Sequence, residues 1–179
     1  MNAIVNVNKK WGIGKDGDLL VSIREDMKFF RNTTKGKVVI MGRKTLDSFP
    51  GKAPLKNRVN IVITSSPSNI SNESFEAVNA DREAGKTTEL IVTGSVEEAA
   101  RIAEAYAPED VFVIGGDSIY RSMLSYCDTC YVTVNDFEGE PDTFFPDLDA
   151  DPEWKLAEQG DEQEENGIKY RFTVYRRKT

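Results

Sequence analysis

The sequence has no histidine, few cysteines and no long hydrophobic run. Without histidine, the chain has no Ser-His-Asp or Cys-His nucleophile system and no zinc site with histidine ligands. No window reaches the roughly 18 apolar residues that a membrane-spanning helix requires. The apolar run Ala3 to Val7 is not followed by a signal-peptide cleavage pattern. We therefore expect a cytoplasmic protein that does not bind a membrane.

The two cysteines, Cys127 and Cys130, have the C-x-x-C spacing of a redox pair or of half a zinc site. A second pair of ligands is missing from the sequence. Cys127 ends a helical pattern and Cys130 opens an apolar, strand-like run, so we expect both thiols to be buried. No metal site is predicted.

Acidic residues outnumber basic ones by 30 to 23, which gives a net charge of −7 over 179 residues. This excess argues against a diffuse interaction with nucleic acid, and an anionic ligand needs a local basic patch. The hydrophobic content of 39% is ordinary for a folded protein. Because no repeat or long linker interrupts the chain, we expect one domain over residues 1–179, by default a monomer.

Short β-branched runs alternate with helical stretches, which predicts an α/β fold with a mostly parallel sheet and helices on both faces. Ser22 with Glu25, and Ser95 with Glu98, fit the capping box that marks the start of a helix. The predicted strands are Ile4–Val7, Lys37–Met41, Arg58–Thr64, Glu89–Val92, Val111–Ile114 and Cys130–Val134.

The C-terminal region has a different pattern. Two strand-like runs, Trp154–Glu158 and Ile168–Arg176, flank an acidic segment that contains glycine. These runs predict an antiparallel hairpin. The acidic segment, Gly160–Gly167, is interpreted as a solvated loop.

A glycine motif, Gly12–Gly17, matches G-x-G-x-x-G and follows the first strand. In a Rossmann fingerprint these glycines form the turn between a strand and a helix, and an acidic residue ends the second strand. Here the helix begins later, and Arg43 and Lys44 follow the second strand. We therefore interpret the motif as a mobile loop over a site, with an ordinary surface loop as the alternative.

Three turns carry groups that suit a phosphorylated ligand. Arg43 and Lys44 follow a strand and precede a helix predicted to open at Thr45, where they can bind a phosphate ester, which favours NADPH over NADH. Thr64-Ser65-Ser66 adds hydroxyl donors, and Gly115-Gly116 allows the backbone to approach a pyrophosphate. Each turn alone is also a common structural device, but three at one sheet edge favour a binding cleft.

Asp26 is the candidate reactive group, because it borders the apolar stripe of the first helix, which consists of Ile23, Met27 and Phe30. A buried carboxylate needs a cation or several hydrogen-bond donors, or else its pKa is raised. The alternative is a carboxylate at the helix edge that turns to solvent.

The chain resembles the dihydrofolate reductase family along essentially its whole length. The motifs that carry this resemblance occur in the family's order. They are GIGKDGDL at Gly12–Leu19, EDMKFF at Glu25–Phe30, VIMGRKT at Val39–Thr45, PLKNR at Pro54–Arg58, VIGGDSIY at Val113–Tyr120, YVT at Tyr131–Thr133 and DTFFP at Asp142–Pro146.

The resemblance implies eight strands, mostly parallel, with an antiparallel C-terminal strand. It also implies NADPH-dependent reduction of 7,8-dihydrofolate to 5,6,7,8-tetrahydrofolate. The hydride would pass to a ring carbon of the pterin while water protonates the adjacent ring nitrogen. The loop from Gly12 to Val21 would close over the reacting atoms.

The resemblance also assigns roles to residues at matching positions. Asp26 is expected to bind the 2-amino group and the neighbouring ring nitrogen of the pterin, supported by the hydroxyl of Thr133. Arg58 is expected to form a forked ion pair with the carboxylate of the glutamate tail. The other substrate-binding candidates are the side chains of Met27, Phe30 and Leu55, the backbone carbonyls near Ile4 and Ile114, and Val5, Asn6 and Tyr120.

For NADPH, the resemblance implies three groups of contacts. Those expected at the 2′-phosphate end are Arg43, Lys44, Thr64, Ser65 and Ser66. Those expected at the pyrophosphate are Thr45, Gly115, Gly116, Asp117, Ser118 and Ile119, and those expected at the nicotinamide are Asn6, Ile13 and Gly14. Leu19, Gly42, Ile114 and Tyr120 are further candidates for contact with NADPH.

Three positions depart from the family's pattern. Leu20 and Val21 stand where Pro-Trp is usual, and Asn6 stands where alanine is usual. The tryptophan normally fixes a water near the carboxylate, so the hydrogen bonds around Asp26 are expected to differ in this chain.

Two other functions stay open. One is a reductase of the same fold that acts on another pteridine- or pyrimidine-like substrate, such as the similar riboflavin-pathway reductases. Arg58 argues against it, because a substrate without a glutamate carboxylate would leave this side chain unused. The other is a binding module that takes up NADPH or folate without turnover.

Overall fold

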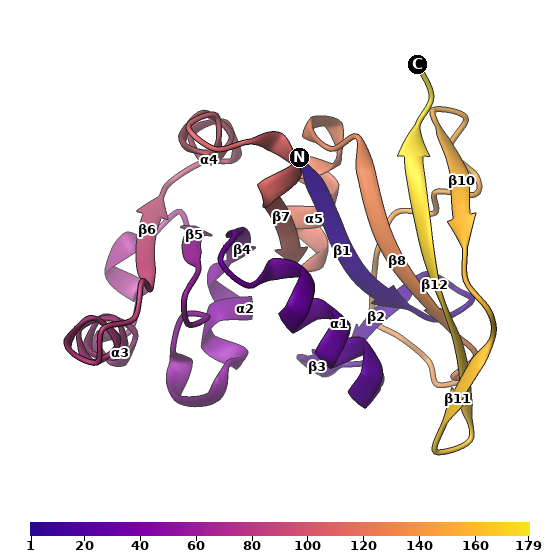
Figure 1. Cartoon of the computed structure of the whole chain (residues 1–179), viewed down its shortest axis with the longest axis horizontal. Coiled ribbons are helices and arrows are strands. Elements are labelled where there is room, and N and C mark those ends of the chain that lie inside the picture. The colour runs from indigo at the N-terminus through magenta and orange to yellow at the C-terminus, as the bar shows by residue number, and fades with distance from the viewer.

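The computed structural model describes residues 1–179, which fold around one mixed sheet (Figure 1). Its main path runs β10-β12-β8-β1-β7-β4-β5-β6, and short β11 also pairs with β12. Neighbours are parallel except that β12 is antiparallel to both β8 and β10. The strands are β1 (Asn2–Val7), β4 (Val38–Gly42), β5 (Val59–Ile63), β6 (Glu89–Thr93), β7 (Val111–Gly115), β8 (Thr129–Asn135), β10 (Trp154–Gln159), β11 (Gln163–Glu165) and β12 (Ile168–Arg177).

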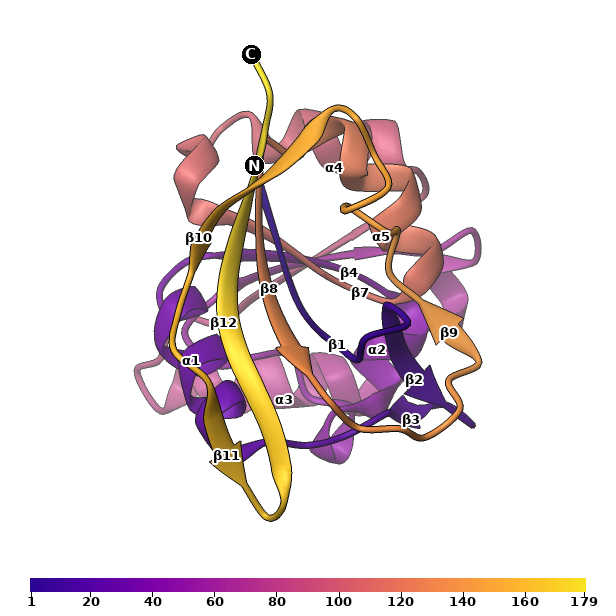
Figure 2. The same cartoon turned by 90° about the vertical axis from the view of Figure 1, so that its right-hand side faces the viewer.

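Helices cover both faces of this sheet (Figure 2), with α4 and α5 on one face and α1, α2 and α3 on the other. The parallel strands are buried on both faces, which explains their nearly continuous apolar sequences. The predicted α/β fold is therefore confirmed. The helices are α1 (Arg24–Thr34), α2 (Arg43–Ser48), α3 (Asn72–Glu83), α4 (Val96–Ala103) and α5 (Asp117–Met123), with 3-10 turns at Pro50–Lys52, Pro67–Asn69, Pro108–Asp110 and Leu124–Tyr126. None of the helices has the length and apolar character needed to cross a membrane.

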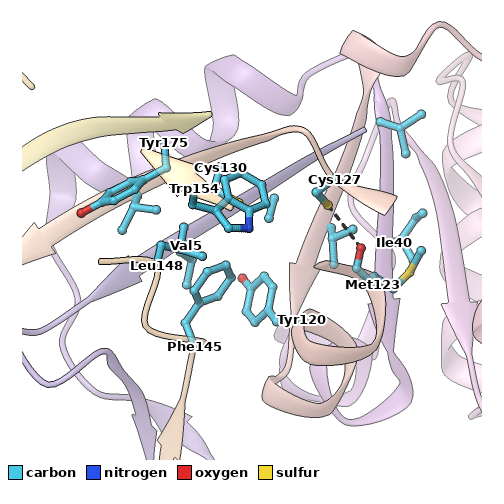
Figure 3. Close-up of a cluster of buried hydrophobic side chains, with 14 of the residues drawn as sticks. Val5, Ile40, Tyr120, Met123, Cys127, Cys130, Phe145, Leu148, Trp154 and Tyr175 are labelled. Carbon is cyan, nitrogen blue, oxygen red and sulfur yellow. Dashed lines mark hydrogen bonds between the residues drawn. The ribbon is translucent and has the colours of Figure 1, made fainter. Parts of the chain in front are cut away.

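The larger core cluster lies between the sheet and the α4/α5 face, and Figure 3 shows part of it. Tyr120 packs edge-on against Phe145, with ring centroids 4.8 Å apart. Cys127 and Cys130 are buried free thiols in the same cluster. The prediction that both thiols are buried is confirmed. Burial raises the pKa of Cys127 to about 12, which makes this thiol unreactive.

The glycine motif forms a hairpin, so its interpretation as a loop is wrong. β2 (Gly12–Lys15) pairs with β3 (Asp18–Leu19) and with β9 (Thr143–Phe144) in a second, three-stranded sheet. The turn residues Asp16 and Gly17 have φ of +51° and +83°, as in a two-residue hairpin turn. A Cβ on Gly14 would lie 2.5 Å from the Thr143 hydroxyl, so glycine is required where β9 packs.

The predicted start of α1 at Ser22 is wrong. The N-cap is Ile23, and no side chain at that position caps the helix. Instead, the carboxylate of Glu165 accepts hydrogen bonds from the backbone N–H groups of Arg24 at 2.6 Å and of Glu25 at 3.4 Å. A carboxylate from β11 thus replaces the local cap and interacts favourably with the helix dipole.

The other predicted helix starts have mixed outcomes. Ser95 caps α4 by accepting a hydrogen bond from the backbone N–H of Glu98 at 3.1 Å, which confirms that prediction. α2 begins at Arg43 rather than at the predicted Thr45. The first turn of α2 therefore includes Arg43 itself.

The antiparallel pairing of β10 with β12 confirms the predicted C-terminal hairpin. The acidic segment Gly160–Gly167 is not entirely a loop, because it contains β11. β11 meets β12 through a turn at Asn166 and Gly167, both with positive φ. This turn places Glu165 beside the start of α1.

Replacement of Glu165 by alanine should lower the free energy of unfolding by about 1 kcal/mol, because two N–H groups of α1 lose their acceptor. Urea denaturation measures the change. Glu164→Ala is the matched control, since Glu164 is exposed and makes no side-chain hydrogen bond or ion pair. Equal losses in the two variants would contradict the cap.

Candidate active site

Helix α1 packs against β8 and β12 through Phe29, whose ring centroid lies 4.9 Å from that of Phe172 and 6.3 Å from that of Tyr131. Ile23 is also buried, at 1% exposure. Asp26 is half-buried and lies between these two residues on the helix face. The packing of α1 therefore turns Asp26 toward the sheet rather than into open solvent.

The predicted apolar stripe of α1 is only partly correct. Met27 is 42% exposed and Phe30 is half-buried, while Phe29 makes the aromatic contacts with the sheet. Met27 and Phe30 therefore keep apolar surface beside Asp26. Such surface suits the face of a planar, aromatic ligand.

The carboxylate of Asp26 faces polar side chains from two parallel strands. Thr133 Oγ1 donates to Asp26 Oδ1 at 2.6 Å. Asn6 lies beside Thr133 in the register of β1 and β8, so its side chain is on the same face of the sheet. Burial raises the pKa of Asp26, while the hydrogen bonds from Thr133 and Asn6 partly oppose this rise.

Sequence reasoning missed Asn135, a buried residue that joins this group. Its Nδ2 donates to Asn6 Oδ1 at 2.7 Å, and its Oδ1 accepts from the backbone N–H of Phe137 at 3.0 Å. Asn135 lies two residues after Thr133 on β8, so both side chains point to the same face. That alternation is the signal that could have revealed it.

Tyr120 reaches the site from the opposite face of the sheet. Its hydroxyl donates to the backbone carbonyl of Ile4 at 2.7 Å, and burial strongly raises its pKa. A carbonyl oxygen has two lone pairs, so Ile4 can still accept a second hydrogen bond. The Val5 side chain lies in the larger core cluster, while Ile114 is half-buried on the Asp26 face.

Arg58 lies near the C-terminal end of α1 and is only 7% exposed. Its Nε donates to Thr34 Oγ1 at 3.0 Å, and its other nitrogens donate to the carbonyls of Lys56 at 2.8 Å and Arg31 at 3.2 Å. Burial and the charge of Arg31 lower the pKa of Arg58. No acidic side chain pairs with it.

A small cavity of about 230 Å³ opens beside Arg58. Its lining combines four basic side chains with two amides and has no acidic residue. A carboxylate is the chemical group that this lining fits. The lining residues are Arg31, Asn32, Lys35, Lys56, Asn57 and Arg58.

The loop that carries Leu55 is fixed by a buried side chain. Asn60 Oδ1 accepts from the backbone N–H of Leu55 at 2.9 Å, and Asn60 Nδ2 donates to the Leu55 carbonyl at 3.0 Å. Leu55 is half-buried and packs against the smaller core cluster. Asn60 thus determines where this apolar side chain stands.

The three turns predicted to bind a phosphorylated ligand are brought together, because β4 lies between β7 and β5. A Cβ on Gly42 would lie 3.1 Å from Ile119 Cγ1, and one on Gly116 would lie 3.8 Å from Thr45 Oγ1. Gly115 has a φ of +119°, and the peptide bond between Gly115 and Gly116 is cis. Glycines therefore line one continuous edge at the carboxyl ends of the strands.

At the far side of this edge, Arg43 pairs with Asp47 at 2.6 Å, one turn further along α2. Sequence reasoning missed this pair, although its i,i+4 spacing is visible in the sequence. Lys44 is exposed. The hydroxyl of Thr64 accepts from the backbone N–H of Ser66 at 3.2 Å, and Ser65 and Ser66 are exposed beyond β5.

The remaining candidates lie in the hairpin and at the start of α5. Ile13 and Gly14 belong to β2, and Leu19 in β3 is 64% exposed. Asp117 Oδ1 accepts from the backbone N–H of Ser118 at 2.9 Å. Residues 8–11 connect the hairpin to β1, the strand that carries Asn6, and β2 contacts β1.

Comparison with known proteins gives consistent results. Residues 1–177 match the family model described as dihydrofolate reductase. The dihydrofolate reductase of Bacillus subtilis (strain 168) is 38% identical over 168 residues, covering 93% of this chain and 88% of the relative. That of Mus musculus is 36% identical over 197 residues, covering 99% and 97%. A solved structure of dihydrofolate reductase from Enterococcus faecalis, complexed with NADP(H) and RAB-propyl, has a TM-score of 0.78 and 30% identity, covering 99% of this chain and 96% of that chain.

Asp26→Asn should become more stable relative to the unchanged protein as the pH rises. Because the pKa of Asp26 is raised in the folded state, the favourable contribution of the protonated carboxyl is complete below the unfolded-state pKa. It is lost as the pH rises through the folded-state pKa, and the asparagine variant does not lose it.

Urea unfolding from about pH 4 to about pH 8 measures this difference. Asp161→Asn, which removes an exposed carboxylate, controls for the change in net charge. A difference in unfolding free energy that stays constant with pH would show that Asp26 ionises without cost.

Proposed function

The chain belongs to the dihydrofolate reductase family, and from this premise we propose that it reduces 7,8-dihydrofolate to 5,6,7,8-tetrahydrofolate with NADPH. The observation that carries the proposal is a pair of opposite charges, Asp26 and Arg58, at the two ends of one helix. Asp26 lies at the start of α1, and Thr34 near its end contacts Arg58. The eight residue steps from Asp26 to Thr34 correspond to about 12 Å along the helix. The unit proposed to act is a single domain over residues 1–179.

The two ends of α1 suit the two ends of dihydrofolate. At one end, the Asp26 carboxylate accepts hydrogen bonds from the 2-amino group and the adjacent ring nitrogen of the pterin. At the other end, Arg58 and the basic cavity bind the carboxylate of the glutamate tail. Between them, Met27, Phe30 and Leu55 contact the pterin and benzoyl rings. This spacing is the reason to prefer a folate over a pteridine that lacks the tail.

The glycine-lined edge fits a dinucleotide phosphate. Gly42 and Gly115 allow Ile119 and Tyr120 of α5 to pack closely against the strand ends, because a Cβ there would press on these side chains. The pyrophosphate binds along this glycine backbone, beside Gly116 and Thr45. Arg43, Lys44 and the hydroxyls that follow β5 bind the 2′-phosphate. When bound, NADPH supplies the hydride that is transferred to a pterin ring carbon.

The residues of this chain orient the pterin and promote its protonation. Asp26 and Thr133 fix the ring, and the negative charge of Asp26 raises the basicity of the ring nitrogen that accepts a proton from water. The carbonyls of Ile4 and Ile114 accept the remaining hydrogen bonds from the ring. The β2–β3 hairpin, with Ile13, Gly14 and Leu19, excludes bulk water near the nicotinamide position.

Purified protein should oxidise NADPH rapidly when dihydrofolate is added, as followed by absorbance at 340 nm. Asp26→Asn should lower turnover by about 10²- to 10⁴-fold, equivalent to roughly 2.7–5.4 kcal/mol, because the pterin loses its charged partner. Affinity for NADPH should change less.

Three outcomes of this assay would contradict parts of the proposal. Near-normal turnover in Asp26→Asn at neutral pH would refute the role of the carboxylate. NADPH binding without oxidation would point to a binding module. Oxidation with a pteridine that lacks the tail, but not with dihydrofolate, would point to another reductase of this fold.

Arg43→Ala should weaken binding of NADPH by about 10- to 100-fold and leave binding of NADH nearly unchanged, because only NADPH carries the 2′-phosphate. Fluorescence titration of each cofactor measures the two dissociation constants. Arg121→Ala removes an exposed arginine from α5 and is the matched control. Equal weakening for both cofactors would mean that Arg43 does not contact the phosphate.

A further inference from the structure

Two asparagine side chains, Asn6 and Asn135, form a hydrogen-bonded amide pair beside Asp26. The pair begins at a donor whose direction is fixed, the backbone N–H of Phe137, which donates to Asn135 Oδ1 at 3.0 Å. Asn135 must therefore present its NH₂ group on its other side. That group donates to Asn6 Oδ1 at 2.7 Å.

The orientation of Asn6 follows from that of Asn135. Because Asn6 Oδ1 is occupied by Asn135, the NH₂ group of Asn6 faces Asp26. The opposite orientation would place a carbonyl oxygen against a carboxylate, which is favourable only when the carboxyl is protonated.

We propose that Asn6 and Asn135 are positioning residues for Asp26: Asn135 orients the Asn6 amide so that its N–H groups face the carboxylate. This inference rests on the proposed function, in which Asp26 binds the pterin. Asn6 acts on the ligand through Asp26, and Asn135 acts through Asn6. The pair favours the ionised form of the carboxylate, against the effect of burial, and directs it toward the substrate.

Burial makes the orientation effective. Asn135 is 2% exposed, so water does not compete for its amide as it would at the surface. The Phe137 segment is itself fixed, because Asn8 Nδ2 donates to the carbonyls of Phe137 at 3.2 Å and Gly139 at 3.4 Å. The first donor of the pair therefore has a defined position.

Few other ionisable groups act on Asp26. Tyr120 from α5 and Tyr170 from β12 are the titratable groups that its charge affects, and the pKa of each is raised. Glu25 on α1 and Glu165 on β11 also act on Tyr170. The pKa of Asp26 itself is set by burial and by the hydrogen bonds from Thr133 and Asn6. The two hydrogen bonds are therefore the main means by which this site favours the ionised carboxylate.

The test is the titration of the Asp26 carboxyl carbon by NMR in the free protein, for Asn6→Ala, Asn135→Ala and the double variant. Asn6→Ala should raise the titration midpoint by about 1 pH unit, because the ionised form loses a hydrogen bond. Asn135→Ala should shift it in the same direction. It should add no further shift when Asn6 is already alanine.

Asn79→Ala is the control, since Asn79 is exposed on α3 and makes no side-chain hydrogen bond. The proposal is overturned if Asn6→Ala leaves the midpoint unchanged. It is also overturned if Asn135→Ala shifts the midpoint equally with and without Asn6, since the two would then act independently.

A measurement on the unchanged protein covers the case in which a variant does not fold. The side-chain NH₂ signals of Asn6 should shift with pH at the midpoint of Asp26, and this shift should be absent in Asp26→Asn. Signals that do not follow Asp26 would overturn the proposal.

The activity readout separates this inference from the proposed function. If the chain reduces dihydrofolate, the acid limb of kcat/KM against pH should move with the NMR midpoint in each variant. An acid limb that stays in place while turnover persists would overturn the positioning role. Absence of turnover would refute the proposed function alone, because the NMR titration of Asp26 does not depend on substrate.

Discussion

The hydrogen bond from Thr133 to Asp26 joins α1 to the central strand β8 at a carboxylate that burial destabilises. The rest of the site depends on this contact. The aromatic packing of Phe29 places α1 on the sheet, and the Glu165 carboxylate fixes its first turn. Because α1 is a rigid helix, the position of Asp26 also sets the position of Thr34, which contacts Arg58. One helix thus relates the two ends of the proposed substrate site.

Much of the fold could be predicted because its signals are local. The parallel strands are buried on both faces, so each appears in the sequence as a β-branched run. All eight long strands, including the two of the C-terminal hairpin, lie within two residues of their predicted bounds. Ser95 shows that a local cap can be recognised in the same way. The Ser22 prediction failed because a distant carboxylate, Glu165, takes the N–H groups that Ser22 was expected to bind.

The same difference between local signals and contacts of distant residues applies to the site residues. Asp26 was predicted from its place beside the apolar stripe of its helix, and Thr133 and Arg58 through the family resemblance. The structure brings Asp26 and Thr133 into direct contact. The hairpin at the glycine motif was missed although its Asp16-Gly17 turn is a local signal. Its pairing with β9, more than 120 residues away, is not visible in the sequence. Asn135 was missed because its importance comes from a pairing with Asn6 across two strands. Contacts of this kind depend on sheet register, which a single sequence does not reveal.

The charges at the two ends of α1 share a feature that bears on ligand binding. None of the ion pairs in the structure includes Asp26 or Arg58. Neutral dipoles stabilise both groups instead: a hydroxyl and an amide at Asp26, and a hydroxyl and two carbonyls at Arg58. Neutral partners orient a charge without cancelling it, so each group keeps its attraction for an ion of opposite sign. A ligand with hydrogen-bond donors at one end and a carboxylate at the other is then the partner that both groups lack.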